Sequence, residues 1–176
     1  MALDEAGEIV FAGAFDPYEI YAWNVQTTNI LQIIRGHEGP VSCLELCGDY
    51  LVTGSWDKTL KIHQVYARKL NVETLEHSSQ ITALAFHPDG KQFAAATIRG
   101  EIYIWEIEDN QLVGIIDAEV EGGRSYFSKI SAENDTNTKY LKTIAYSECG
   151  KYLIGGGKSK YIYFYDIQHR MLLQKI

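Results

Sequence analysis

Short apolar runs separated by turn residues recur along the whole chain. The runs are rich in β-branched and aromatic side chains, and they end at turn sequences such as residues 88–90 (PDG) and 148–150 (ECG). No long window has the period of an amphipathic helix. Residues 161–165 are continuously apolar, which is typical of a strand buried on both faces. The pattern predicts an all-β fold.

The runs group into units of similar length. His37 and His77 are 40 positions apart, and so are Val41 and Ile81. Leu141 follows Ile81 by 60 positions, which is one period plus an insertion of 20. A period near 40 with an aromatic residue late in each unit indicates the four-stranded blades of a β-propeller. We expect blades at about 1–35, 36–76, 77–117 and 140–176, with an interblade insertion at 118–139.

The number of units predicts an open arc. The second unit has four candidate strands, at 41–46, 50–54, 59–65 and 69–75, whereas the first unit has at most the end of its first strand. Because propellers close with about four to eight blades, we expect one incomplete propeller domain of about four blades. Its two end blades would expose apolar sheet. We expect the remainder of a longer protein or another chain to cover them.

One edge of the blades carries the candidate partner-binding residues. In a blade, the turn between the second and third strands leaves on the same edge as the connection to the next blade. Trp56, Lys58 and Arg99 are therefore expected to share an edge with the insertion, which contains Tyr126 and Phe127. Long connections on a rigid scaffold commonly bind partners. Trp56 is the best candidate anchor; the alternative is that it packs on its own blade.

Charge is distributed unevenly along the chain. The 176 residues include 16 basic and 23 acidic side chains, yet residues 141–176 hold six basic and two acidic ones. The overall acidity argues against nucleic-acid binding by the whole surface, because phosphate contacts need clustered Lys and Arg. Lys158 and Lys160, in the basic end unit, are candidate contacts to RNA phosphate or to an acidic partner; the alternative is a solvated face. The apolar share of 46% is too high for disorder, and no apolar stretch is long enough to cross a membrane.

No residue pattern indicates an enzyme. Residues 155–159 (GGGKS) lack the first glycine of a phosphate-binding loop, so a tight turn is expected there. Cys43 and Cys47 could join His37 or His63 in a zinc site, but without a second cysteine pair we expect core cysteines. The sequence contains no nucleophile elbow of the Gly-x-Ser-x-Gly type. We therefore expect no catalytic residue, no metal and no cofactor.

The units resemble WD repeats, from residues 36–37 (GH) at the start of one unit to residues 55–59 (SWDKT) in its turn. In that family a buried tetrad links a His, a Ser or Thr, an Asp and a Trp. The resemblance places this structural tetrad at His37, Thr53, Asp57 and His63, with a histidine in the tryptophan position. An imidazole can still donate a hydrogen bond, but it buries less apolar area than an indole.

The resemblance narrows to one family. Five segments are similar, in the same order, to the periodic tryptophan protein 2 family: residues 36–44 (GHEGPVSCL), 55–62 (SWDKTLKI), 107–117 (IEDNQLVGIID), 121–127 (EGGRSYF) and 155–167 (GGGKSKYIYFYDI). The resemblance implies a non-enzymatic scaffold of the small-subunit processome, the nucleolar U3 snoRNP particle that matures small-subunit rRNA. It implies processome proteins as partners and contact to pre-rRNA or small nucleolar RNA as an option, without a membrane. The alternative is a cytosolic WD-repeat adaptor unrelated to ribosome assembly.

Overall fold

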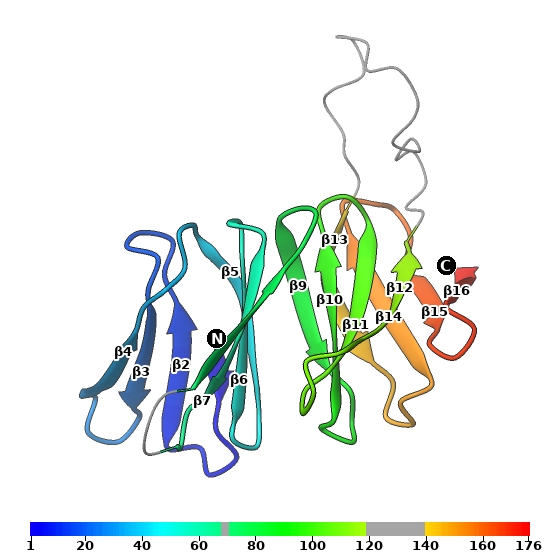
Figure 1. The fold of residues 1–176 in the computed structure, drawn as a ribbon. Coiled ribbons are helices and arrows are strands. Elements are labelled where there is room, and N and C mark those ends of the chain that lie inside the picture. Colours follow the sequence, from blue (N-terminus) through cyan, green and yellow to red (C-terminus); the bar gives the residue numbers. More distant parts are fainter. Residues whose placement is uncertain (68–70, 119–139) are drawn as a thin grey trace, which may run out of the picture.

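Four antiparallel sheets of four strands each stand side by side as the blades of an open arc in a computed structural model of the chain (Figure 1). The structure describes residues 1–67, 71–118 and 140–176. Consecutive strands pair within each sheet, and no helix occurs in these three ranges. The predicted all-β fold and the open arc of four blades are confirmed.

The strands follow one another without crossing between sheets. Blade 1 contains β1 (Ala2–Leu3), β2 (Ile9–Gly13), β3 (Ile20–Asn24) and β4 (Ile30–Ile34). Blade 2 contains β5 (Val41–Cys47), β6 (Tyr50–Ser55), β7 (Thr59–Gln64) and β8 (Val72–Glu76). Blade 3 contains β9 (Ile81–Phe86), β10 (Gln92–Thr97), β11 (Glu101–Glu106) and β12 (Leu112–Asp117). Blade 4 contains β13 (Leu141–Tyr146), β14 (Tyr152–Gly157), β15 (Tyr163–Asp166) and β16 (Met171–Lys175).

Neighbouring blades bury their apolar faces against each other. Between blades 2 and 3, Val52 and Ile62 pack in one cluster with Ile81, Leu84 and Phe93. None of these five side chains is more than 6% exposed. Burying one such side chain stabilises the fold by about 1.5–3 kcal/mol relative to leaving it in water. Similar clusters join blade 1 to blade 2 and blade 3 to blade 4.

A repeated hydroxyl contact ties the first strands of successive blades together. Ser42 Oγ donates to the Ile81 carbonyl at 2.8 Å, and Thr82 Oγ1 donates to the Leu141 carbonyl at 2.7 Å. A small residue on the second strand makes room for this approach, because a Cβ on Gly54 would lie 2.6 Å from Ile81 Cγ2.

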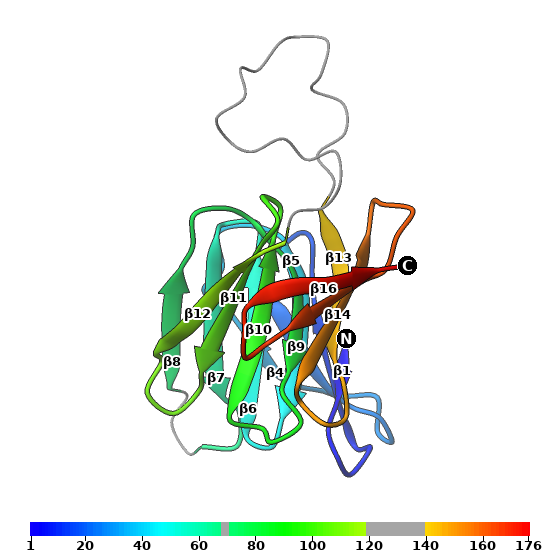
Figure 2. The ribbon, with the colours of Figure 1, turned by 90° about the vertical axis from the view of Figure 1, so that its right-hand side faces the viewer.

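Seen from the side of blade 4 (Figure 2), the fourth strands β8 and β12 lie along one margin and β13 lies near the other.

The outward faces of blades 1 and 4 are apolar and exposed. On blade 1, Leu3 and Ile33 are 54% and 39% exposed. On blade 4, Ile162 and Met171 are 50% and 53% exposed. These residues alternate with the side chains that pack on the neighbouring blade, so each end sheet buries one face only. The described ranges hold no helix with the length and apolarity needed to cross a lipid bilayer.

The expectation that residues 161–165 form one strand buried on both faces is wrong. The strand β15 begins at Tyr163, and Tyr161 and Ile162 are 39% and 50% exposed. Tyr163 and Tyr165 are fully buried because they face blade 3, whereas the intervening Phe164 faces outward and is only partly buried. A continuous apolar run therefore marks two apolar faces without showing that both are covered.

Candidate functional site

A chain of hydrogen bonds in blade 2 joins the four residues of the expected tetrad. His37 Nδ1 lies 2.9 Å from Asp57 Oδ2, and His37 Nε2 lies 2.9 Å from Thr53 Oγ1. His63 Nε2 lies 3.1 Å from the same hydroxyl oxygen. One arrangement of protons satisfies the chain: His63 donates to Thr53, Thr53 donates to His37, and His37 donates to Asp57. The imidazole of His63 thus supplies the donor that an indole would otherwise provide.

Burial keeps both imidazoles of this chain neutral. It lowers the pKa of His63 to about 4. Burial also lowers the pKa of His37, although the hydrogen bond to Asp57 opposes this effect. Partial burial works to raise the pKa of Asp57, but hydrogen bonds from Thr59, the Glu38 amide and His37 outweigh it and hold that pKa below its usual value. The chain therefore carries a single negative charge, on Asp57, at neutral pH.

The tetrad holds the β6–β7 turn against the segment that enters the blade. Asp57 Oδ2 accepts a hydrogen bond from the Glu38 amide at 2.9 Å, and the Trp56 amide donates to the Pro40 carbonyl at 3.0 Å. The same backbone bond joins Ile98 to Gln80 in blade 3 and Lys158 to Tyr140 in blade 4. The turns between second and third strands and the connections between blades therefore lie on one edge, the upper edge in Figure 1, which we call the loop edge.

Blade 3 keeps a shortened form of the tetrad. Trp105 Nε1 donates directly to His77 Nε2 at 3.1 Å, because Ala95 stands where blade 2 has Thr53. His77 Nδ1 donates to the Leu75 carbonyl at 3.2 Å. Burial lowers the pKa of His77 to about 4, so this imidazole is also neutral at physiological pH.

Three of the five candidate partner-binding residues lie on the loop edge. Lys58 and Arg99 are exposed in the turns of blades 2 and 3, and Trp56 is 44% exposed beside Lys58. The other two, Tyr126 and Phe127, lie outside the described residues. The structure thus gathers three candidates on one edge of adjacent blades.

Phe15 is an interaction candidate that sequence reasoning missed. Its ring meets the Trp56 ring edge to face, with the centroids 5.4 Å apart and an angle of 86° between the ring planes. Phe15 lies in the β2–β3 turn, at the same edge of blade 1 as Trp56 occupies on blade 2, and it is 65% exposed. Trp56 therefore makes its ring contact with the neighbouring blade. The position of apolar Phe15 in a turn was the signal that could have marked it as exposed. Its contact with Trp56 could not be predicted, because that contact depends on how the two blades pack.

Lys158 and Lys160 are exposed in the β14–β15 turn of blade 4. Lys158 Nζ lies 5.5 Å from the centroid of the Tyr140 ring, and Lys175 Nζ lies 5.4 Å from the centroid of the Tyr161 ring. Such cation–π contacts contribute about 0.5–1 kcal/mol at exposed sites. The end blade thus presents ammonium groups beside tyrosine rings, an arrangement that can contact phosphates and stack with bases.

The glycine run at 155–157 lies in a strand, so the expectation of a turn at these residues is wrong. Gly155 pairs with Ile144, and Gly157 ends strand β14. A Cβ on Gly157 would lie 2.0 Å from the Tyr140 carbonyl oxygen. The glycines therefore permit close strand pairing, and the turn begins only at Lys158.

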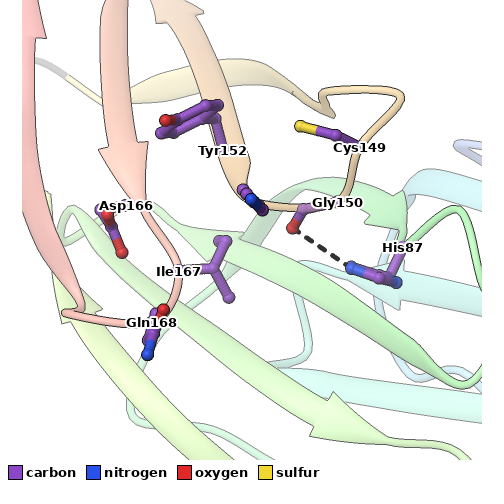
Figure 3. Close-up of a pocket in the computed structure, with 8 residues that line it drawn as sticks. His87, Cys149, Gly150, Tyr152, Asp166, Ile167 and Gln168 are labelled. Atoms are coloured by element: carbon purple, nitrogen blue, oxygen red, sulfur yellow. Dashed lines mark hydrogen bonds between the residues drawn. The ribbon is translucent and has the colours of Figure 1, made fainter.

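A pocket opens between blades 3 and 4, at their turns on the edge opposite the loop edge (Figure 3). It encloses about 260 Å³. Polar groups at its rim are engaged in turn contacts, since His87 Nε2 lies 3.2 Å from the Gly150 carbonyl oxygen and His87 Nδ1 lies 2.7 Å from Asp89 Oδ1. Asp166 Oδ1 accepts a hydrogen bond from the His169 backbone amide at 2.7 Å. The pocket therefore contributes to the junction of two blades.

The described cysteines do not gather with other metal-binding side chains. Burial raises the pKa of Cys43 to about 12, so its thiol is protonated at neutral pH. Burial also raises the pKa of Cys47. Among the residues that the structure places, no group of three or more His, Cys, Asp and Glu side chains could hold a metal ion.

Comparison with known proteins defines the class of this chain. Residues 28–64 match the family model of the WD domain, G-beta repeat, and residues 54–130 match that of the anaphase-promoting complex subunit 4 WD40 domain. A chain in the crystal structure of the mitotic checkpoint complex has a TM-score of 0.78 over 99% of this chain and 49% of that chain, at 20% identity. That likeness shows the fold alone. The chain is a WD-repeat β-propeller protein.

Sequence relatives define the family more narrowly. The periodic tryptophan protein 2 homolog of Schizosaccharomyces pombe is 40% identical over 99% of this chain. Periodic tryptophan protein 2 of Saccharomyces cerevisiae is 39% identical and the Mus musculus homolog 36% identical, each over 99% of the chain. The chain spans about a fifth of these relatives, namely 21%, 19% and 20% of their lengths. It belongs to the periodic tryptophan protein 2 family, as its sequence motifs predict.

Proposed function

We propose that the chain is part of a non-enzymatic scaffold of the small-subunit processome, the nucleolar U3 snoRNP particle, and that it supports small-subunit rRNA maturation. The observation that carries this proposal is identity of 36–40% to periodic tryptophan protein 2 relatives over 99% of the chain. The loop edge supports a binding role, because hydrogen-bonded turns hold exposed aromatic and cationic side chains on a rigid array of blades.

The loop edge binds two kinds of partner. Trp56, Lys58 and Arg99 bind other processome proteins, because aromatic and arginine side chains contribute most of the energy at interfaces. Tyr126 and Phe127 of the insertion add apolar contacts to the same partners.

The basic end of the loop edge serves a second kind of partner. Lys158 and Lys160 contact pre-rRNA, small nucleolar RNA or an acidic protein segment. The rest of a longer protein, or another chain, covers the apolar outer faces of blades 1 and 4.

Purification of the tagged intact protein from cells tests the proposal. We expect U3 small nucleolar RNA and precursors of small-subunit rRNA to co-purify, and the tagged protein to lie in the nucleolus. Depletion should slow small-subunit rRNA maturation while large-subunit rRNA maturation continues. A cytosolic protein without precursor RNA would overturn the proposal and favour an adaptor unrelated to ribosome assembly.

A further inference from the structure

Phe15 and Trp56 form an exposed aromatic pair at the junction of blades 1 and 2. Their side chains are 65% and 44% exposed. Tyr18, in the same turn as Phe15, is 40% exposed. A group of large exposed aromatic rings on a folded surface marks an interaction site.

Backbone hydrogen bonds from both blades hold this aromatic pair in place. The Val41 amide of blade 2 donates to the Ala14 carbonyl of blade 1 at 3.3 Å. The Trp56 amide donates to Pro40, the residue before Val41, at 3.0 Å. Both rings therefore project from turns that are bonded to one short segment, and little conformational entropy is lost when a partner binds them.

The aromatic pair lies in acidic surroundings. Asp16 follows Phe15, and Glu38 bonds through its amide to Asp57, the neighbour of Trp56. Both Asp16 and Glu38 are exposed, and neither carboxylate has an ion-pair partner among the described residues. Of the five acidic side chains in residues 1–34, Asp16 and Glu19 lie in the same turn as Phe15, and Glu19 is paired with Arg35. Lys58 is an exposed base at the border of this surface.

We propose that the aromatic pair binds a basic segment of a partner protein, with an arginine stacked on the Trp56 ring beside Phe15. Guanidinium groups stack on aromatic faces and donate paired hydrogen bonds to carboxylates. Asp16 and Glu38 are the carboxylates that accept these bonds. The negative potential of this surface attracts such a segment and repels RNA phosphate. The inference rests on the protein-binding role proposed above and specifies the partner's chemistry.

Selection of short random peptides displayed on phage, with the intact protein as bait, tests the inference. We expect the selected peptides to be enriched in arginine beside an apolar residue. In fluorescence-polarisation titrations with a selected peptide, Trp56→Ala should weaken binding about tenfold or more. Asp16→Asn combined with Glu38→Gln should weaken it and reduce its salt dependence.

Tyr66→Ala is the matched control, because Tyr66 is 49% exposed in the β7–β8 turn on the opposite edge. It should leave peptide binding unchanged. Enrichment of acidic peptides, or equal binding by the Trp56→Ala protein, would overturn the inference. So would competition by a single-stranded oligouridine for the same surface. If the protein still co-purifies with small-subunit rRNA precursors, such a result rejects this inference alone.

Discussion

His63 is the residue of the blade 2 tetrad that departs from the WD-repeat pattern. The imidazole is fully buried and lies where blade 3 has Trp105. Its Nε2 atom donates to Thr53, while its Nδ1 atom is buried without a hydrogen-bond partner. The unpaired Nδ1 acceptor has a free-energy cost, whereas the hydrogen bond of Nε2 and the packing of the buried ring stabilise blade 2.

Replacing His63 tests this contribution. The substitution His63→Ala removes the donor to Thr53 and leaves a cavity, so it should lower the free energy of unfolding by about 1–3 kcal/mol. Chemical denaturation of the 176-residue chain measures the change. The control His169→Ala removes a histidine side chain that is 65% exposed, and its effect should stay within about 0.5 kcal/mol. Equal effects of the two substitutions would contradict the role of His63.

The neutral histidines predict a pH dependence of stability. The native pKa values of His63 and His77 are about 4, below the unfolded value of about 6.5. Between these values the unfolded chain binds more protons, so the free energy of unfolding should fall as the pH falls. The slope should reach about 1.4 kcal/mol per pH unit for each histidine. Denaturation curves across this window measure the slope, and His77→Gln should reduce it; a flat profile would contradict the assignment.

The junction between blades is the element on which the arc depends. The junctions between blades 2 and 3 and between blades 3 and 4 combine an apolar cluster with a hydroxyl bond between first strands, and a small residue, Gly54, lies on the second strand of blade 2. Gly54 and Gly156 occupy this last position in blades 2 and 4, since they pair with Cys43 and Thr143. Only Gly54 has a neighbouring blade packed against it in the structure.

The two glycines provide a matched pair of substitutions. Gly54→Ala places a Cβ 2.6 Å from Ile81 Cγ2 and should destabilise the chain by about 1–3 kcal/mol. Gly156→Ala meets Thr143 Cγ2 at an ordinary 3.6 Å and should change the free energy of unfolding by less than about 1 kcal/mol. Thermal or chemical unfolding of the two variants decides between these outcomes. Tolerance of Gly54→Ala would show that the blades do not approach as closely as described.

Local pattern predicts the elements of this chain better than their contacts. The first strand of blade 2 was expected at 41–46 and is observed at Val41–Cys47, because repeat spacing and turn residues mark both ends. The resemblance to WD repeats also predicted the members of the tetrad. The contact of Phe15 with Trp56 was not, because it joins two repeats and depends on their relative orientation. The exposure of Ile162 was missed for the same reason, since burial requires a neighbouring sheet.

At the scale of the whole molecule, the two apolar end faces determine how the isolated chain should behave. Leu3 and Ile33 on one end and Ile162 and Met171 on the other have exposed fractions of 39–54%. Exposed apolar sheet faces favour association with other surfaces. The chain spans about a fifth of its relatives, 19–21% of their lengths, and we propose that further parts of a longer protein or another chain cover these faces.

The isolated 176-residue chain should therefore self-associate as its concentration rises. Sedimentation velocity measures this tendency. Ile33→Glu combined with Met171→Glu places charges on both end faces and should reduce association. Leu112→Glu is the control, because Leu112 is 43% exposed on strand β12 of the inner blade 3. A monodisperse monomer at high concentration would contradict the open-ended arc.

The most direct test compares the two edges of the blades in the intact protein. The measurement is the amount of U3 small nucleolar RNA that co-purifies with each tagged variant. Trp56→Ala combined with Lys158→Glu alters the loop edge and should reduce the recovered RNA several-fold. Tyr66→Ala combined with Lys91→Glu makes matched changes on the opposite edge and should leave the recovery unchanged. Full recovery with the loop-edge variant, or no U3 RNA with the unmodified protein, would contradict the account.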